Sequence, residues 1–526
     1  MKRFLKIISL TAIIAVVSVS LPSCKTVPED TSSVQIETQE EYVSEIVGAD
    51  GSTNAENGDN ATRTPSGKNN TTATPSNKDN NGNSNAVSSD NKTNNNTSTA
   101  SGDGDSTDNE SENKSKTPDV TICAAVASNI YIVGGVCSKD TEYITVSGNG
   151  IETTKITAAK GQSQNYFIGQ VKVNSYSQIE VKCKEIGKEL SSAVKKTVSL
   201  NPSLSQNLMT KDDYRPVFSG DSRMHFYSSV LSYTKSNIVS DAVKSTANMN
   251  ISATVNAAKS VGAEVIYLVV PSSAAVYPET LPSEYTKASG ESLYDAFSSI
   301  ATSNGAKVIY PLDTMKSHKN DGDGYKIYSH TDSHWTTYGA YYGVSELMNY
   351  ISIKYPSAKP RTVSQMGFYV TELSGGDSLF SFNDSTGFEN AASANSNNAA
   401  TVKTKINELT TLYSLKMPTD TLSAITRNKK SIYLTKANAD TSTFINPNGS
   451  GLPSAVIVRD SFGRTAYDMV NDRFSKIDWL AEGDYTNVDS YIYNNRPNYV
   501  IYIVSERNLF KVMLGTQSVS LTDMAH

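Results

Sequence analysis

Histidine is scarce in this 526-residue chain, which limits where acid–base chemistry can occur. The five are His225, His318, His330, His334 and His526. The densest polar cluster is His330-Thr331-Asp332-Ser333-His334-Trp335, and Tyr341–Ile351 after it predicts a helix. Asp332 and His334 are two residues apart, so on an extended loop both side chains leave the same face. A carboxylate placed in this way orients an imidazole and stabilises its charged form. The simpler interpretation is a polar loop with a helix cap.

A histidine base needs a nucleophile, and Ser461 has a suitable context. The apolar run Ala455–Val458 predicts a buried strand, Asp460-Ser461-Phe462-Gly463 follows closely, and Arg464–Val470 is compatible with a helix. At a strand-to-helix turn, backbone N–H groups and the helix dipole stabilise a developing oxyanion. The plainer interpretation is an ordinary helix-capping serine.

Ser222 is a rival nucleophile. It ends the triplet Gly220-Asp221-Ser222, which opens many lipase-like esterases. The residues after it, Arg223–Tyr227, predict a strand or turn and not the start of a helix. The context therefore favours Ser461 over Ser222.

The elements around these residues alternate between strands and helices from about residue 211 to residue 526. Such alternation predicts an α/β domain with a mostly parallel sheet flanked by helices. Ser381–Thr401, rich in Asn, Ser and Ala, predicts a surface insertion. The expected helices are Asp241–Val261 and Ser292–Thr302, and the expected strands are Ala263–Val270, Lys307–Tyr310, Ala455–Val458 and Tyr499–Val504.

Residues 118–205 predict a small all-β module. Short β-favouring runs are separated by turn signals, in the manner of a β-sandwich, and the outline resembles immunoglobulin-like modules. A spacer or a glycan-contacting role is expected. Cys137 and Cys183 could bridge two strands or remain free thiols, and Cys123 is the third cysteine here. The expected strands are Val120–Val126, Asn129–Val136, Glu142–Val146, Tyr166–Val173 and Gln178–Cys183.

Residues 1–24 predict an export signal. A basic start precedes the apolar run Ile7–Leu21, and Leu21-Pro22-Ser23-Cys24 is similar to a lipobox. We expect lipidation of Cys24 and an extracytoplasmic protein anchored in the cell membrane. An ordinary signal peptide is the alternative, as is a single membrane anchor, although the run is shorter than the roughly 20 residues of a span. Residues 25–117, rich in Asn, Ser and Thr, predict a disordered tether.

Charge and composition narrow the partners. The net charge is −6 and no basic block stands out, which argues against nucleic acid. No Cys/His cluster has metal-ligand spacing, so we predict no metal and no cofactor.

The motifs resemble a known family. Thr331–Thr336 with Gly339-Ala340, followed by Val458–Phe462, is similar to the DHHW family and to the related SGNH-like proteins of alginate O-acetylation. The resemblance extends over about Tyr214–Phe510. It implies an SGNH-hydrolase-like fold and places Ser222 in a structural segment. The middle histidine of the Asp-His-His-Trp signature is Ser333 here, closer to an Asp-Thr-His-Trp form.

The resemblance also implies roles. Asp332 orients the base His334, Ser461 is the nucleophile, and the residues that would shape the site are Arg459, Asp460 and Trp335. It implies a surface-anchored acetyltransferase acting on an extracellular or cell-wall polysaccharide, with a membrane-bound O-acyltransferase as partner. A carbohydrate acetylesterase with the same triad is the alternative enzyme. A non-catalytic glycan-binding or assembly lipoprotein is the alternative of another class.

Overall fold

The structure is a computed structural model of the whole chain. It describes residues 113–161, 163–200, 202, 216–322, 325–330, 333–373, 415–419, 421, 433–437, 441–481, 488–516 and 521. The predicted signal peptide, nearly all of the tether, the insertion at 381–401 and Asp332 lie outside the described residues. Lys114 and Ser115, which the sequence placed in the tether, pair with Glu189. Of the described helices, none has both the length and the apolar character of a membrane span.

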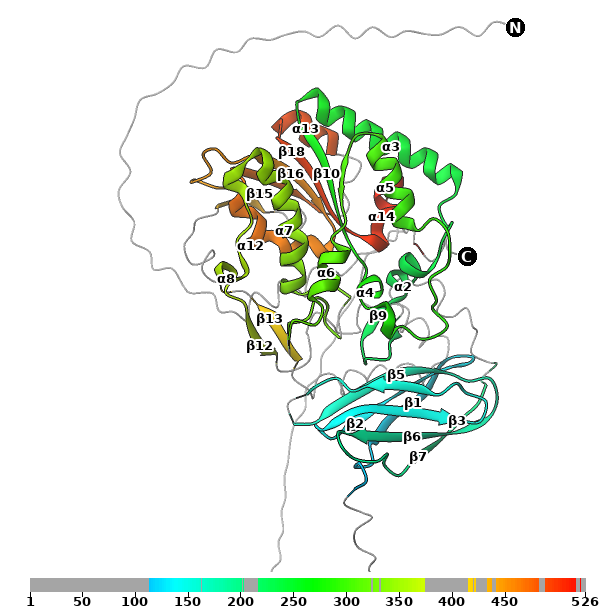
Figure 1. The fold of residues 1–526 in the computed structure, drawn as a ribbon. Helices are drawn as coiled ribbons and strands as arrows, with labels where there is room; N and C mark the ends of the chain where they lie inside the picture. Colours follow the sequence, from blue (N-terminus) through cyan, green and yellow to red (C-terminus); the bar gives the residue numbers. More distant parts are fainter. Residues whose placement is uncertain are drawn as a thin grey trace, which may run out of the picture. The chain divides into compact units, whose positions relative to one another are not determined.

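The N-terminal described part is an all-β module of two antiparallel sheets (Figure 1). Inward residues of both sheets, such as Phe167 and Ile144, form one core. Along β6, for example, Ile179, Val181 and Cys183 are buried and alternate with more exposed residues, as a half-covered strand requires. The sheets are β1 (Asp119–Ala127), β2 (Ile130–Cys137) and β5 (Asn165–Lys172), and β4 (Thr154–Thr157), β3 (Thr141–Gly148), β6 (Ser177–Glu185) and β7 (Val194–Val198).

The three cysteines of the module are free thiols. Cys137 and Cys183 are buried, and the hydroxyl of Thr141 lies 3.1 Å from Cys183 Sγ. Of the two alternatives that the sequence left open, a disulfide between Cys137 and Cys183 or free thiols, the structure has free thiols. Burial raises the pKa of the Cys137 thiol to about 12, which disfavours the reactive thiolate. The immunoglobulin-like assignment of the module stays a prediction.

The C-terminal part has a mixed α/β fold, as predicted. Its sheet has the strand order β11-β10-β18-β16-β17-β15-β14, with parallel pairing from β11 to β17 and antiparallel pairing for β15 and β14. The strands are β10 (Glu264–Val270), β11 (Lys307–Ile309), β14 (Tyr433–Ala437), β15 (Thr441–Ile445), β16 (Ser454–Arg459), β17 (Lys476–Leu480) and β18 (Tyr499–Ser505).

Helices cover both faces of this sheet, with α3, α5 and α14 on one side and α6, α7 and α12 on the other (Figure 1). Alternate residues of β18 enter opposite cores: Val500 and Tyr502 pack with the first group, Ile501 and Ile503 with the second. The principal helices are α2 (Tyr227–Thr234), α3 (Asp241–Ser260), α4 (Ser273–Val276), α5 (Leu293–Ser303), α6 (Leu312–His318), α7 (Thr337–Lys354), α8 (Val363–Met366), α12 (Tyr467–Val470), α13 (Val488–Asn495) and α14 (Leu509–Leu514).

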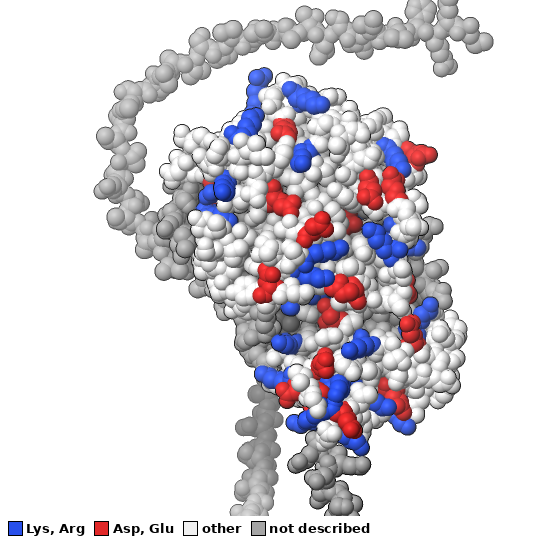
Figure 2. Space-filling model, in the orientation of Figure 1, with Lys and Arg blue, Asp and Glu red and all other residues white. Residues whose placement is uncertain are grey.

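Shorter elements complete the domain. Two antiparallel pairs lie outside the main sheet, and single 3-10 turns connect several elements. On the face drawn in Figure 2, Lys and Arg side chains are interspersed with Asp and Glu. The two pairs are β8 (Pro216–Phe218) with β9 (Met224–Phe226) and β12 (Tyr369–Leu373) with β13 (Leu415–Thr419), and the 3-10 turns are η2 (Pro278–Thr280), η3 (Pro356–Ala358), η6 (Ser461–Ala466), η7 (Asn471–Arg473) and η8 (Glu506–Asn508).

Helix α7 begins closer to the polar cluster than the sequence predicted. Thr336 caps it by accepting a hydrogen bond from the N–H of Gly339 at 3.0 Å. A Cβ on Gly339 would lie 2.3 Å from the carbonyl oxygen of Ile327, so only glycine allows this close approach. The first turn of α7 is therefore held directly against the loop that contains His334.

Candidate active site

Ser461 and His334 meet in the structure although 127 residues separate them in the sequence. His334 Nε2 lies 2.7 Å from Ser461 Oγ, and both residues are half-buried. This distance is within the range expected between a nucleophile and its base. The arrangement can move the serine proton to the imidazole.

The position of Ser461 follows from the sheet. Asp460 and Ser461 come directly after β16, at the carboxyl ends of the parallel strands, where open α/β sheets bind ligands. The helix expected over Arg464–Val470 begins earlier than predicted: the 3-10 turn η6 starts at Ser461, and the four-residue α-helix α12 follows it. Ser461 is thus the first residue of a helix, as expected, but of a 3-10 helix, and the stabilisation of negative charge at this position stays a prediction. Within the turn, the N–H of Gly463 donates to the carbonyl of Asp460, which is the spacing of a 3-10 helix.

Asp460 holds the turn that presents Ser461. Its carboxylate is fully buried and accepts four hydrogen bonds, from the N–H of Phe462 (3.0 Å), the N–H and hydroxyl of Ser505 (both 2.7 Å) and the amide of Asn508 (2.9 Å). Its own N–H donates to the carbonyl of Ile503. These bonds tie the end of β16 to the end of β18.

Trp335 and Phe462 join the two halves of the site. The indole N–H of Trp335 donates to the carbonyl of Phe462 at 2.9 Å. The Phe462 ring lies 4.6 Å from the His334 ring between centroids, and Arg507 lies over the same phenyl ring at 5.3 Å. The residues that follow His334 and Ser461 are thus packed against each other.

Replacing Trp335 by phenylalanine should remove the bond to Phe462 and leave a buried carbonyl without its donor. We expect a loss of about 1–3 kcal/mol in stability. We also expect kcat for an acetyl ester to fall by up to about 10²-fold, because the loop that carries His334 would shift by up to about 1 Å relative to Ser461. Steady-state kinetics and thermal unfolding check both. The matched control is Trp479→Phe, whose indole N–H donates to Asn471 at 2.8 Å instead; an equal loss of kcat in the control would contradict the argument.

Arg459 is buried and packs against η6, the turn that begins at Ser461. Its Nε donates to the hydroxyl of Tyr467 at 2.7 Å, and its side chain fills the space beside Gly463, where a Cβ would lie 2.5 Å from Arg459 Cβ. Of the predicted site-shaping residues, Arg459, Asp460 and Trp335 thus all contact η6 or the residue after Ser461.

Two other predicted residues have different outcomes. Asp332 lies outside the described residues, so its pairing with His334 stays a prediction. Ser222 is 2% exposed, and its hydroxyl donates to the carbonyl of Thr157 at 2.7 Å and accepts the N–H of Ile168 at 3.3 Å. Both partners are backbone groups of the β module, and this environment differs from that of a base-activated nucleophile.

Sequence reasoning missed Ser505 and Asn508 as supports of the site. The available signal was the polar run Ser505-Glu506-Arg507-Asn508 directly after a buried strand of a parallel sheet. Within the described ranges, no group of three or more His, Cys, Asp or Glu side chains could hold a metal ion.

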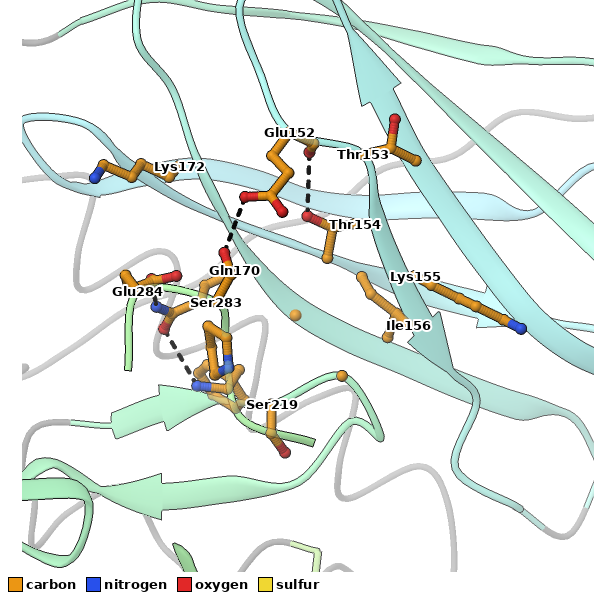
Figure 3. Close-up of a pocket in the computed structure, with 14 residues that line it drawn as sticks. Glu152, Thr153, Thr154, Lys155, Ile156, Gln170, Lys172, Ser219, Ser283 and Glu284 are labelled. Atoms are coloured by element: carbon orange, nitrogen blue, oxygen red, sulfur yellow. Dashed lines mark hydrogen bonds between the residues drawn. The ribbon is translucent and has the colours of Figure 1, made fainter. Parts of the chain in front are cut away.

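A cleft of about 180 Å³ lies elsewhere, between the β module and the α/β domain (Figure 3). Its lining is mixed polar and apolar, and two hydrogen bonds cross it: Gln170 donates to Glu284 at 2.6 Å, and Ser283 donates to Glu152 at 2.9 Å. Ser461 and His334 are not among its lining residues.

His225, in β9, is a second histidine bonded to a serine, but it is fully buried. Its Nδ1 lies 2.7 Å from the hydroxyl of Ser273, and its Nε2 has no partner among the described residues. Burial, helped by the charge of Arg223, lowers the pKa of His225 to about 3. The imidazole is thus neutral in the folded protein over most of the pH range.

This burial predicts a pH dependence of stability. Between pH 6.5 and 3 the unfolded chain binds a proton on His225 that the folded protein does not bind, so stability falls as the pH decreases. The contribution is at most about 1.4 kcal/mol per pH unit. Denaturant unfolding at several pH values should therefore show a shallower slope for His225→Asn than for wild type. An unchanged slope would refute the assignment.

Comparison with known proteins places this site in context. Residues 226–408 match the family model described as the SGNH hydrolase-like domain of the acetyltransferase AlgX. The segment resembles that domain. The resemblance predicted from the motifs is confirmed here, and the matched residues include Asp332 and His334 and end before Ser461. None of the curated proteins compared matches the chain.

Three of the solved structures to which the chain is similar are the following. A DHHW family protein from Eubacterium siraeum is 15% identical, with 64% of this chain and 95% of that chain covered and a TM-score of 0.35. PatB1 of Bacillus cereus, solved with a sulfonyl adduct, is 15% identical, with 56% and 96% covered and a TM-score of 0.38. The O-acetyltransferase domain of AlgJ from Pseudomonas putida is 15% identical, with 59% and 94% covered and a TM-score of 0.37.

Proposed function

We propose that the protein is a surface-anchored O-acetyltransferase that acetylates an extracellular or cell-wall polysaccharide through a covalent acetyl-serine. The observation that carries this proposal is the 2.7 Å contact between Ser461 Oγ and His334 Nε2 at the carboxyl edge of the parallel strands. The match of residues 226–408 to the SGNH-like domain of an acetyltransferase supports the choice of acetyl chemistry.

In the first half-reaction, Ser461 Oγ attacks the carbonyl carbon of an acetyl donor. The serine proton passes to His334 Nε2, and His334 then gives this proton to the departing group as the bond between the acetyl carbon and that group breaks. Asp332 would hold the other ring nitrogen of His334 and stabilise the imidazolium. The product is an acetyl ester on Ser461.

The oxyanion of this step needs backbone donors near Ser461. In the described turn, the N–H of Phe462 bonds to the carboxylate of Asp460, and the N–H of Gly463 bonds to its carbonyl. These two groups are therefore engaged, and the N–H of Ser461 itself is the donor that the start of the turn can offer to the oxyanion.

In the second half-reaction, a sugar hydroxyl of the polysaccharide attacks the acetyl-serine. Its proton passes to His334 and then to Ser461 Oγ as the ester bond to the serine breaks, so the enzyme is regenerated. A membrane-bound O-acyltransferase would supply acetyl groups across the membrane. If water attacks instead of the sugar, the same residues give an acetylesterase.

Product analysis separates these outcomes. The full chain is incubated with 4-nitrophenyl acetate in the presence and absence of polysaccharide fragments, and acetylated glycan and free acetate are measured by mass spectrometry. A transferase yields acetylated glycan that depends on Ser461. Release of acetate alone, unchanged by the acceptor, would support the esterase. Absence of turnover with every donor would favour a binding protein.

The anchoring part of the proposal depends on Cys24. Cells expressing the chain would be labelled with an alkyne fatty acid and fractionated. Wild type should carry the label and sediment with the membrane, whereas Cys24→Ser should be unlabelled. Labelling of Cys24→Ser to the wild-type level would contradict lipidation at this cysteine.

A further inference from the structure

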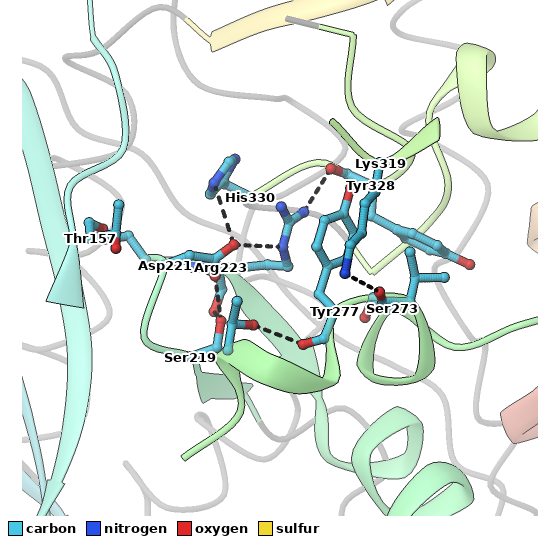
Figure 4. A network of polar contacts seen from close by, with 12 residues as sticks. Thr157, Ser219, Asp221, Arg223, Ser273, Tyr277, Lys319, Tyr328 and His330 are labelled. Carbon is cyan, nitrogen blue, oxygen red and sulfur yellow. Dashed lines mark hydrogen bonds and ion pairs between the residues drawn. The ribbon is translucent and has the colours of Figure 1, made fainter. Parts of the chain in front are cut away.

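Arg223 is one of the largest fully buried side chains of the described protein, with 1% exposure. It lies in the turn between β8 and β9, far in sequence from His334. Its Nη1 donates to two successive carbonyls, those of Tyr328 and Ser329, both at 2.7 Å. Figure 4 shows the guanidinium directed at this loop. A charged group used in this way fixes the backbone of the loop it binds.

The same turn holds the next residue of the loop. The N–H of Met224 donates to the carbonyl of His330 at 2.7 Å, and the His330 Nε2 lies 3.9 Å from the carboxylate of Asp221. Three carbonyls in sequence, from Tyr328 to His330, thus bond to Arg223 and Met224.

Asp221 orients Arg223 and is charged at neutral pH. Its carboxylate accepts bonds from Arg223 Nε at 3.3 Å, from the N–H of Arg223 at 3.2 Å and from the hydroxyl of Ser219 at 2.7 Å (Figure 4). Burial acts to raise the pKa of the Asp221 carboxyl, but the charges of Arg223 and His330 outweigh it and hold that pKa far below its usual value. The pair is therefore ionic, and removing one partner would leave the other uncompensated.

The loop that these residues hold is the one that carries His334. Its two ends are paired: the N–H of Thr336 donates to the carbonyl of Ile327 at 2.9 Å, and Tyr328 forms a β-bridge with Trp335. Arg223 and Met224 bond to residues 328–330, on one side of this pairing, and His334 lies on the other side. Because the two sides are paired, movement of residues 328–330 displaces His334.

The β module holds the other side of the turn. Besides the two bonds of the Ser222 hydroxyl to Thr157 and Ile168, the N–H of Thr157 donates to the carbonyl of Gly220 at 2.6 Å. Ser222 has a left-handed backbone with φ of 64°, a conformation that a serine retains only where its surroundings impose it. The turn between β8 and β9 is thus bonded to the β module on one side and to residues 328–330 on the other.

We propose that Asp221 and Arg223 are positioning residues for the proposed reaction, which hold residues 328–330 so that His334 Nε2 faces Ser461, and that the β module supports them through Ser222. This inference rests on the proposed function, because it assumes that His334 and Ser461 react. It gives the Gly-Asp-Ser triplet a role that differs from that of a nucleophile.

The test uses the full chain with Arg223→Ala, Arg223→Lys and Asp221→Asn. With 4-nitrophenyl acetate, Arg223→Ala should lower kcat by about 10- to 100-fold with little change in KM, because the reacting atoms are misplaced while the substrate site is intact. Millimolar guanidinium should restore part of the lost kcat, and Arg223→Lys should retain more activity than Arg223→Ala. The matched control is Arg361→Ala, which breaks an arginine pair with Asp472. It should leave kcat unchanged.

A second readout does not depend on turnover. With five histidines in the chain, the ring signals of His334 can be assigned in ¹H–¹³C NMR spectra by comparison with His334→Gln. Arg223→Lys and Asp221→Asn should shift the His334 ring signals, and Ser222→Ala should shift them less and lower kcat only a few-fold.

The outcomes separate the two proposals. If wild type neither turns over the ester nor reacts with phenylmethanesulfonyl fluoride at Ser461, the proposed function fails. If wild type reacts and folded Arg223→Ala and Arg223→Lys retain wild-type kcat and His334 signals, the positioning inference is overturned. The same conclusion follows if Arg361→Ala loses as much kcat as Arg223→Ala.

Discussion

Ser461→Ala should lower kcat for acetyl-ester turnover by at least about 10³-fold, and His334→Gln should lower it to a similar level. The reason is that neither residue works without the other: the serine is a weak nucleophile until the imidazole takes its proton. The double variant should therefore be no worse than the worse of the two single variants. Initial rates with 4-nitrophenyl acetate, together with thermal unfolding to verify folding, measure this.

The decisive comparison for this prediction is Ser222→Ala. Because the hydroxyl of Ser222 bonds only backbone groups of the β module among its described contacts, its loss should weaken packing and lower the turnover only a few-fold. Phenylmethanesulfonyl fluoride should label Ser461 in both wild type and Ser222→Ala, as peptide mass spectrometry will show. Retained activity in Ser461→Ala with lost activity in Ser222→Ala would overturn the assignment of the nucleophile.

Buried strands that are continuous apolar runs, such as β10 and β18, were predictable, whereas the buried strand β17, which contains Asp478, was not predicted. Tyr499–Val504 was expected and Tyr499–Ser505 is found; Ala263–Val270 was expected and Glu264–Val270 is found. A strand that is covered on both faces has apolar residues at successive positions, so it can be recognised in the sequence as a continuous apolar run. The two antiparallel strands at one end of the sheet, β15 and β14, lack this signal and were not predicted.

The meeting of Ser461 with His334 was also predictable, but from chemistry and family resemblance and not from periodicity. Few histidines are present, and one of them follows an aspartate at a spacing typical of a catalytic loop. What the residues could not indicate was the 3-10 turn at Ser461. Its cause is a set of contacts from distant chain segments, in which Ser505 and Asn508 hold Asp460.

The contacts of the Gly-Asp-Ser triplet could not be predicted for the same reason. Locally, Gly220-Asp221-Ser222 has the composition of an esterase motif. In the structure, Asp221 pairs with Arg223, and Ser222 bonds to the β module, which is more than fifty residues earlier in the chain. A motif of three residues carries no information about such partners, and only the fold supplies it.

Asp460→Ala should have the second-largest effect, because it affects both folding and chemistry. Four donors converge on this fully buried carboxylate, and removing it would leave them without an acceptor. Hydrogen bonds to a charged group each contribute about 1.5–3 kcal/mol, so a loss of about 3 kcal/mol or more in stability is expected. For a domain of this size that lowers Tm by about 6–12 °C.

Asp460→Asn separates the chemical effect from the structural one. The amide preserves the shape, and with its NH2 group at the Oδ1 position it loses the bond from the N–H of Phe462 and keeps the three bonds to Oδ2. We expect Tm to fall less than in Asp460→Ala, while kcat still falls by about 10²-fold, because the turn that aims Ser461 at His334 moves. Asp478→Asn is the matched control: this buried aspartate of β17 accepts a bond from Thr443 at 2.7 Å and does not contact the turn. If Asp460→Asn keeps full activity, or Asp478→Asn loses as much, the fixed turn at Asp460 is not what aligns Ser461.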